Sequence, residues 1–244
     1  MLPSLGNASG YRLPDQSASA MGMGGAFAGQ AADPSAAWYN PACITQLDVT
    51  RIAGGVSFVY PAISHQNLDG TTDAIERRTS ETAHFYATHK MSENLFLGMS
   101  VNNPFGLLTN WSATSETNQL GTFSKVYSIQ ANPSLAYKFS DKLSAAIGID
   151  YIYFKATLEN VIDPSTGNIL RMTGDGDAWG VNAALFYKPT SKLGFGFTYR
   201  SRLRVSISGT ADSDGGAVSN PLTSVITLPD LYQLGASYQV SDKF

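Results

Sequence analysis

The stretch 125-KVYSIQANPSLAYKFSDKLSAAIGIDYIYF-154 alternates between two kinds of side chain. Before the break at Ser140, the odd positions include Tyr127, Ile129, Leu135 and Tyr137, whereas the even positions are mostly polar or small. After it, every second residue from Leu143 to Tyr153 is apolar. A period of two is typical of a strand whose faces meet different surroundings. The stretch therefore predicts two antiparallel strands joined by a tight turn.

The same arrangement recurs along the chain, which indicates a repeated strand–turn–strand unit. The copies are 88-THKMSENLFLGMSV-101, 136-AYKFSDKLSAAIGI-149, 186-FYKPTSKLGFGFTY-199 and 237-SYQVSDKF-244. Each has Lys or Gln, then a short polar turn, then an apolar residue that opens a new alternating run. Long polar segments separate the copies. Short turns on one side and long loops on the other are typical of an outer-membrane β-barrel.

Composition supports this interpretation. The chain is 43% hydrophobic but only 14% charged, against about 25% charged in soluble domains. It lacks the run of about 20 apolar residues that a membrane-spanning helix needs. A soluble β-barrel or sandwich would also alternate, but low charge, strands of ten or more residues and apolar faces ending in Tyr or Trp favour a transmembrane barrel.

Several classes of function are disfavoured. A net charge of −3 without a basic cluster argues against nucleic acid as a partner. The single cysteine, Cys43, leaves no intrachain disulfide, and neither a metal site nor a cofactor motif is predicted. His65, His84 and His89 fall in no nucleophile arrangement, so an outer-membrane enzyme is a weaker alternative.

The two ends of the chain suggest processing and a cut. Residues 1–8 end in Gly6-Asn7-Ala8, a small-x-small pattern that predicts a signal-peptide remnant before a mature start near Ser9. At the other end Phe244 follows a turn, and Asp242 interrupts the alternation that a terminal strand would need. We therefore expect the chain to stop one residue into a strand.

The region 9-SGYRLPDQSASAMGMGGAFAGQAADPSAAWYNPACITQLDVTRIAGGVSFVYP-61 resembles the FadL/TodX family of outer-membrane transporters for hydrophobic compounds. Matching features are Tyr11, the small-residue stretch GMGGAFAG and the triplet Asn40-Pro41-Ala42. The segments SVNNPFGLLTNW, TYRSRLRVSISG and ITLPDLYQLGASYQV also resemble that family.

The resemblance implies a 14-stranded barrel of the Gram-negative outer membrane, plugged by an N-terminal hatch. It implies a hatch at residues 9–47 and the first part of the barrel at 48–244. The partners would be outer-membrane lipids, lipopolysaccharide and a hydrophobic small molecule, and the full-length protein would be a monomer. The alternation gives eight strand candidates, at 48–60, 80–91, 93–103, 125–139, 142–157, 177–188, 192–208 and 224–240.

Two sets of residues are candidates for gating. In the hatch they are Tyr11, Asn40, Pro41 and Ala42, with Asn40-Pro41-Ala42 expected to form a turn between hatch and barrel. In the third strand, Pro104 cannot donate to a ladder and Gly106 weakens it, so we expect a kink. The resemblance places a lateral exit there, at Asn102, Asn103, Pro104, Phe105 and Gly106; a plain strand end entering a loop is the alternative.

Two further sets concern the cargo. An apolar landing surface on an outer loop is predicted from Leu107, Leu108, Trp111, Leu120 and Phe123, although a solvated loop would look similar. Lumen candidates are Ile152, Phe154, Lys155, Arg200, Arg202 and Arg204. Because Leu193, Phe195, Phe197 and Tyr199 are expected to face lipid, the three arginines are predicted to face the lumen. There they need an anionic ligand or internal partners such as Asp150, Asp230, Asp15 or Asp33, and internal ion pairs are favoured.

Passive transport of hydrophobic molecules, either long-chain fatty acids or aromatic hydrocarbons, is the function that these patterns favour. A general porin is the alternative, although the small-residue N-terminal segment argues against it.

Overall fold

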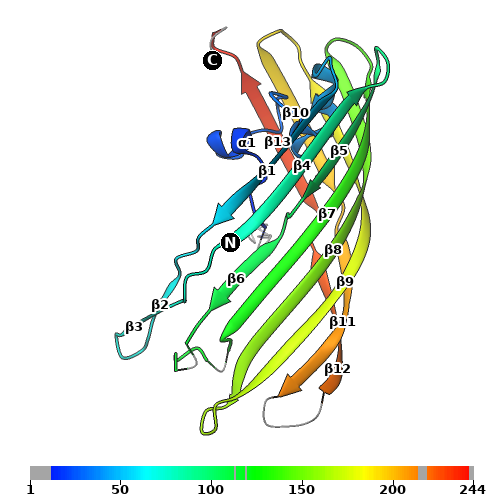
Figure 1. The fold of residues 1–244 in the computed structure, drawn as a ribbon. Coiled ribbons are helices and arrows are strands. Elements are labelled where there is room, and N and C mark those ends of the chain that lie inside the picture. The colour runs from blue at the N-terminus through cyan, green and yellow to red at the C-terminus, as the bar shows by residue number, and fades with distance from the viewer. Residues whose placement is uncertain (1–11, 113, 119, 214–218, 242–244) are drawn as a thin grey trace, which may run out of the picture.

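The computed structural model describes residues 12–112, 114–118, 120–213 and 219–241. Within them, one large antiparallel sheet curls around a few short helices (Figure 1). The predictions for residues 1–8, Tyr11 and Phe244 lie outside the described residues. None of the described helices is long and apolar enough to cross a membrane.

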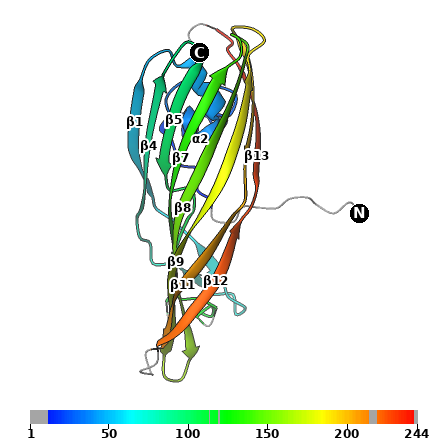
Figure 2. The same cartoon turned by 90° about the vertical axis from the view of Figure 1, so that its right-hand side faces the viewer.

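The helical elements all precede the sheet. They are α1 (Ala18–Gly22), α2 (Ala36–Tyr39) and the 3-10 helix η1 (Pro41–Gln46). We call residues 12–47 the hatch. Figure 2 shows the sheet curving around the hatch at the end where the chain's tight turns lie. We call that end the turn end, and the opposite end the loop end.

The strands follow one another with short and long connections in alternation. They are β1 (Arg51–Val59), β2 (Ser64–Gln66), β3 (Thr72–Ala74), β4 (Ser80–Lys90), β5 (Leu95–Asn102), β6 (Gly106–Asn110), β7 (Phe123–Lys138), β8 (Leu143–Asp163), β9 (Asn168–Tyr187), β10 (Leu193–Arg200), β11 (Leu203–Ser213), β12 (Ser219–Leu228) and β13 (Leu231–Tyr238).

The sheet runs in the order β1-β4-β5-β7-β8-β9-β10-β13, and β2 and β3 form a separate hairpin. Strand β6 continues β5 beside β7, while β11 and β12 continue β10 and β13 towards the loop end. In the described residues β1 and β13 stay unpaired with each other, so the sheet is an open half-barrel. The predicted all-β fold with eight wall positions is confirmed.

The strand boundaries differ from the prediction mainly at the loop end. Strand β8 ends at Asp163 and strand β9 begins at Asn168, so both are longer than predicted. The predicted strands 192–208 and 224–240 are each broken in two, at Ser201–Arg202 and Pro229–Asp230. The short strands β2, β3 and β6 were not predicted.

The outward face carries an apolar band bordered by aromatic rings. Tyr187 lies opposite Leu143 near the turn end, and Tyr151 packs on Trp179 with 4.8 Å between ring centroids. From Leu143 to Tyr153 a tilted strand rises about 25 Å, which matches the apolar band of outer-membrane barrels. From Tyr153 onward the outward residues include charged ones, beginning with Asp177 opposite Tyr153 and continuing with the pair Lys155 and Asp175.

The hatch packs against small side chains on the inner wall. Ala136, Ala146 and Ala184 lie in one register row across β7, β8 and β9, and all three are buried. They form a core with Phe27, Trp38, Ile44 and other hatch residues. A row of alanines leaves room for a helix to approach the sheet, so the hatch lies directly on the wall.

Candidate functional site

The third wall strand is interrupted at the predicted position. β5 pairs with β7 up to Asn102 opposite Gln130, and β6 resumes at Gly106 opposite Tyr127. Four steps along the third strand therefore match three along β7, which is the count of a β-bulge. The predicted interruption at residues 102–106 is located correctly.

On its other side, the third strand separates from β4. The β4–β5 ladder ends at His84 opposite Asn102, and a backbone bond resumes only from Glu76 N to Asn110 O, at 2.7 Å. Between these points the side-chain oxygen of Asn103 accepts a 2.8 Å bond from Ala83 N. A side chain thus replaces ladder bonds where the β4–β5 ladder has ended.

The Ser128 side chain of β7 also replaces ladder bonds, in this case those of the Phe105 backbone. Its hydroxyl accepts a 3.0 Å bond from Phe105 N and donates a 2.7 Å bond to Phe105 O. The Asn103 amide also donates to Ser128 O at 2.6 Å. These bonds matter because a buried backbone group without a partner costs about 1–3 kcal/mol.

The first described part of the hatch lies against this interruption. Arg12 forms an isolated antiparallel bridge with Phe105, and Leu13 N donates to Pro104 O at 2.9 Å. The Gln16 side chain donates to Asn103 O at 2.8 Å, and Tyr86 OH donates to Gln16 O. Residues 12–16 therefore cover the interruption from inside.

The lumen beside the interruption is apolar. Phe105, Ile152 and Phe154 are buried in one cluster, together with Ala178, Leu203, Val205, Ile207 and Leu228. The predicted lumen positions of Ile152 and Phe154 are correct. The arrangement joins a residue of the broken strand directly to the apolar interior of the half-barrel.

The triplet Asn40-Pro41-Ala42 is buried and fastens the hatch to the wall. Asn40 caps η1 by accepting from Ala42 N at 3.0 Å, and Pro41 sits at the start of that helix. The Asn40 amide donates to Ala28 O at 2.7 Å and to Leu185 O at 3.1 Å. The triplet does not form the predicted turn between hatch and barrel. It lies within the hatch, where α2 ends and η1 begins, and Asn40 connects two parts of the hatch with β9.

A second contact of the hatch depends on glycine. A Cβ at Gly196 would collide with the carbonyl of Ala28, and Gly194 and Gly235 are similarly close to Ala28 and Gly29. Ser237 Oγ donates to Gly29 O at 2.6 Å. The backbone of residues 28–29 thus rests on the backbones of β10 and β13.

The charged lumen candidates divide into one correct and three wrong predictions. Arg200 faces inward and pairs with Asp150. Its guanidinium also lies 4.2 Å from the Trp38 ring centre and donates to Trp38 O at 3.1 Å. Asp150 further accepts from Gln130 at 2.7 Å and Asn182 at 3.1 Å, so the internal ion pair is the correct alternative for Arg200.

Arg202, Arg204 and Lys155 do not face the lumen. The break after Arg200 shifts the alternation by one residue, so Leu203 and Val205 point inward while Arg204 is exposed. Arg202 remains at the break, more than half exposed, and pairs with Asp230 at 2.9 Å. Lys155 shares the outward face with Tyr151 and Tyr153, because all three are odd-numbered residues of β8.

The predicted landing surface is not a single patch. Leu107 and Leu108 are consecutive residues of β6 and point to opposite sides of the sheet. Leu120 is 89% exposed in the loop, whereas Trp111, directly after β6, and Phe123, the first residue of β7, are half-buried. The prediction grouped residues that are close in sequence, but neighbouring residues of a strand point to opposite faces of the sheet.

Four residues at the site were missed: Arg12, Gln16, Trp38 and Ser128. A small polar residue at an inward position of an alternating strand resembles many others, so Ser128 carried no distinguishing signal. Arg12, Gln16 and Trp38 find their partners far along the chain, up to 162 positions away for Trp38, and no local pattern reveals such contacts.

Residues 2–244 match the family model of the outer membrane protein transport proteins OMPP1/FadL/TodX. The chain belongs to this family. It is therefore a protein of the Gram-negative outer membrane, in agreement with the predicted location.

The relatives include a long-chain fatty acid transport protein of Salmonella typhi, 26% identical over 239 residues, covering 84% of this chain and 53% of that protein. The chain spans about half the length of the curated relatives it matches. Among solved structures, a Pseudomonas aeruginosa FadL homologue superposes with a TM-score of 0.79 at 16% identity, covering 95% of this chain and 67% of the other. The P. putida toluene transporter TodX gives 0.69 at 17% identity, with coverages of 91% and 66%. At these identities the structures support the fold.

Proposed function

We propose that the complete protein lets hydrophobic molecules cross the outer membrane passively, and that they leave sideways through the interrupted third strand. The observation that carries the proposal is the position of Phe105. It belongs to the interruption, packs with Ile152 and Phe154 in the apolar lumen, and is bridged by Arg12 of the hatch. A route from lumen to bilayer through this point would be apolar on both sides.

The physical reason is the solvation of the cargo. An apolar molecule gains nothing in a water-filled pore, but burial against apolar side chains is favourable by about 25 cal/mol per Å². The small-residue hatch blocks an open aqueous path, and residues 12–16 cover the interruption. Displacement of residues 12–16 would uncover the interruption without breaking a regular ladder. The side chains of Asn103 and Ser128 already replace ladder bonds at the interruption.

The cargo class is part of the proposal. Relatives are named as transporters of long-chain fatty acids and of toluene. We propose cargo of one of these classes, with the outer leaflet and its lipopolysaccharide as the surroundings of the loop end.

Uptake by cells tests the lateral exit. Cells that lack their own transporter would express the complete gene, unchanged or with Pro104→Ala/Gly106→Val, and receive radiolabelled oleate or toluene. Alanine at 104 restores a backbone donor and valine at 106 favours a regular strand, so the pair should close the interruption. The added Cβ at 106 meets only the end of the Leu13 side chain, which is flexible. We expect uptake of one cargo by the unchanged protein and at least tenfold less by the double variant, at equal surface levels.

The matched control is Pro133→Ala/Gly121→Val. Pro133 lies in the regular β5–β7 ladder, and a Cβ at Gly121 would meet its nearest atom, Glu159 O, at 3.8 Å, an ordinary contact. This pair should leave uptake unchanged. If the unchanged protein takes up small hydrophilic solutes but neither oleate nor toluene, a porin is indicated instead. If both double variants lose uptake to the same extent, the exit at the third strand is refuted.

A further inference from the structure

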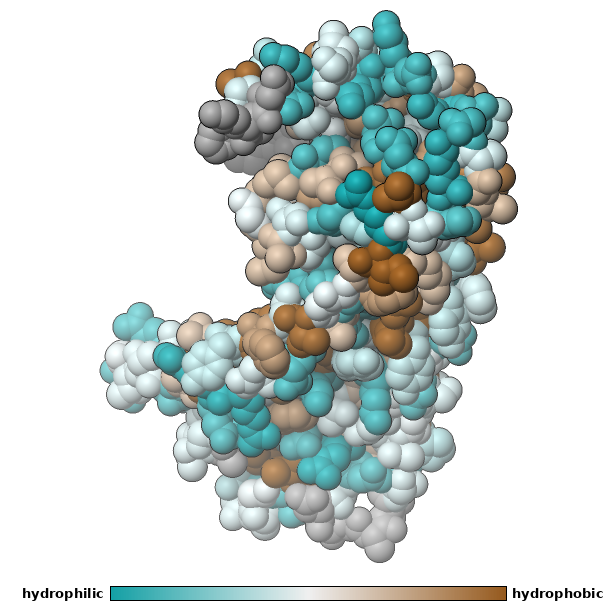
Figure 3. Space-filling model, turned by 45° about the horizontal axis from the view of Figure 1, so that its top comes forward, coloured by the Kyte–Doolittle hydropathy of each residue, from teal (hydrophilic) through white to brown (hydrophobic). Residues whose placement is uncertain are grey.

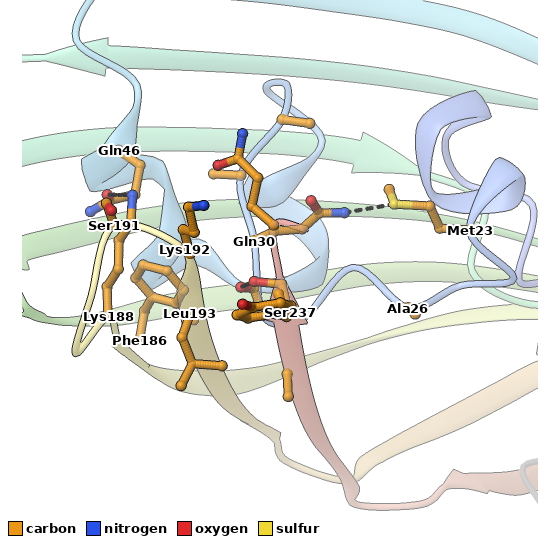
Figure 4. A pocket seen from close by; sticks show the side chains of 17 residues that line it. Met23, Ala26, Gln30, Gln46, Phe186, Lys188, Ser191, Lys192, Leu193 and Ser237 are labelled. Carbon is orange, nitrogen blue, oxygen red and sulfur yellow. Dashed lines mark hydrogen bonds between the residues drawn. The ribbon is translucent and has the colours of Figure 1, made fainter. Parts of the chain in front are cut away.

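Lysine occurs at two levels of the sheet. Six of the chain's eight lysines lie in the turns of the repeated unit, and hydrophilic residues gather over the turn end, at the top of Figure 3. Among these lysines, Lys188 and Lys192 line a cavity that also reaches Met23 and Gln30 of the hatch (Figure 4). That cavity lies along β13, an edge strand of the sheet, so its charge and shape do not define a site. The other two lysines lie at the opposite border of the apolar band.

These two lysines, Lys125 and Lys155, are neighbours on the outward face of the central strands. Both are exposed odd-numbered residues, one in β7 and the other in β8. Lys125 lies opposite Thr157 and Lys155 lies opposite Tyr127, so the lysines form a diagonal pair about 7–8 Å apart. Both strands have hydrogen-bonded neighbours on either side. This face is therefore independent of the open edges of the sheet.

The pair lies at the level of lipid headgroups. Tyr127 precedes Lys125 by one outward position on the way from the turn end, and Tyr153 precedes Lys155 in the same way. Tyrosines at the border of an apolar band mark the interface between hydrocarbon and headgroups. In outer-membrane barrels the long loops are extracellular. The lysines therefore face the headgroups of the outer leaflet.

Neither lysine is neutralised by a carboxylate of its own strands. No ion pair or side-chain hydrogen bond involves Lys125 or Lys155 in the part of the chain that the structure describes. Glu159, the diagonal neighbour of Lys125 on its other side, pairs with Arg171 at 2.7 Å instead. Strands β6 and β7 contain no aspartate or glutamate. On the β7 side of the pair, the local charge is thus positive.

Two carboxylates lie on the β9 side. Asp175 is opposite Lys155 and Asp177 is opposite Tyr153, and both aspartates are exposed. The carboxylate of Asp175 interacts with the Tyr153 hydroxyl rather than forming an ion pair with Lys155. The two aspartates therefore border the lysine pair on one side and leave the space between the lysines to another anion.

We propose that Lys125 and Lys155 bind a phosphate of lipopolysaccharide in the outer leaflet, with the acyl chains of this lipid lying along the apolar band. Ammonium groups hold phosphate through short, charge-assisted hydrogen bonds. Two adjacent cations repel each other, and an anion between them turns that repulsion into attraction. Leu108 of β6 lies opposite Lys125, so the lipid sits beside the interrupted third strand. The inference concerns the lipid around the wall and does not rest on transport.

Binding of defined lipids to the complete protein in nonionic micelles tests the site. Native mass spectrometry measures how much lipid is bound at each lipid concentration. The probes are lipid A with both of its phosphates and the same acylated disaccharide without phosphate. EDTA is present throughout, so that no divalent cation bridges a phosphate to Asp175 or Asp177. We expect the phosphorylated lipid to bind at least tenfold more tightly.

The lysines are tested by Lys125→Gln/Lys155→Gln, which changes two exposed side chains. This variant should lose the tenfold preference, equivalent to about 1.4 kcal/mol, while binding of the lipid without phosphate stays unchanged. Lys125→Arg/Lys155→Arg keeps both charges and should keep the preference. The matched control is Lys138→Gln/Lys142→Gln, which removes the same charge at the turn end and should also keep it.

Two results overturn the site: equal binding of both lipids to the unchanged protein, and a preference that survives Lys125→Gln/Lys155→Gln. Equally tight binding of phosphatidylglycerol, a phospholipid with one anionic phosphate, would overturn lipopolysaccharide as the partner. None of these results bears on uptake through the third strand, so the two proposals fail separately.

Discussion

The side chain of Asn40 bonds to three separate parts of the chain, although it is fully buried and uncharged. Asn40→Ala removes all three bonds and leaves Ala28 O with one partner fewer. A buried group left unsatisfied costs about 1–3 kcal/mol, so local opening of the hatch should become roughly 5–150-fold more frequent. The measurement is the alkylation rate of Cys43, whose thiol is buried beneath Ala28.

Burial raises the pKa of the Cys43 thiol, so it should react only when the hatch opens. Asn94→Ala, in an exposed turn, is the control and should leave the rate unchanged. An Asn40→Ala protein that reacts no faster would show that Asn40 does not hold the hatch closed.

Asp33 gives the hatch a pH dependence. Its partial burial would raise the pKa of the carboxyl group, but bonds from Ser19 and from the hydroxyl and amide of Ser35 lower it below its ordinary value. A lowered pKa contributes stability above about pH 4, the pKa of an unfolded aspartate, and this contribution is lost as the pH falls through the folded value. The urea midpoint reported by Trp38 fluorescence, in a W111F/W179F background, should therefore fall between pH 5 and pH 3.

Asp33→Asn should remove that part of the decrease and lower the midpoint at pH 7. Asp48→Asn, at an exposed position after the hatch, should reproduce the unchanged protein. A pH dependence that persists in Asp33→Asn would assign it to other carboxylates.

Strands β10 and β13 meet the hatch through glycine rather than through side chains. Gly196→Ala places a methyl group where the Ala28 carbonyl lies, and backbone cannot yield as a flexible side chain can. We expect residues 28–29 to lift from the wall and Cys43 to alkylate at least tenfold faster. Gly22→Ala, where a Cβ would meet nothing within 4 Å, is the matched control, and similar rates in the two variants would contradict the contact.

The elements also show how far a sequence pattern reaches. Alternation predicted the strands well between Lys125 and Tyr153, because lipid outside and hatch inside impose opposite chemistry on the two faces. It failed along Gly174–Asp177, where the outward residues of β9 are Asp175 and Asp177 and the apolar signal disappears. It also failed at Arg204, because a one-residue irregularity reverses every later side chain and leaves no mark in composition.

The interruption at Pro104 was predictable because proline removes a ladder donor, whatever surrounds it. The hydrogen-bond partners of the interruption were not predictable. Ser128 and Gln16 reach it from 23 and 87 positions away, and a hydrogen bond over that distance depends on the finished fold.

Across the whole molecule, Arg200 and Asp150 join β10, β8 and the hatch around one buried ion pair. Asp150→Ala leaves a buried guanidinium without its carboxylate, which should destabilise the protein by about 3–5 kcal/mol. Asp150→Leu/Arg200→Met removes both charges and should restore most of that loss. Urea unfolding of the refolded protein in micelles measures both, and a double variant as unstable as Asp150→Ala would show that packing, not charge, determines the effect.

The row formed by Ala136, Ala146 and Ala184 has a consequence for how such a protein is assembled. The hatch core finds its partners on a sheet whose edge strands β1 and β13 are not joined to each other. A plug that is held by one side of the wall does not need a finished ring to receive it. All wall residues of the hatch core precede the end of β9, so we expect this core to form without any contribution from β10 or later strands.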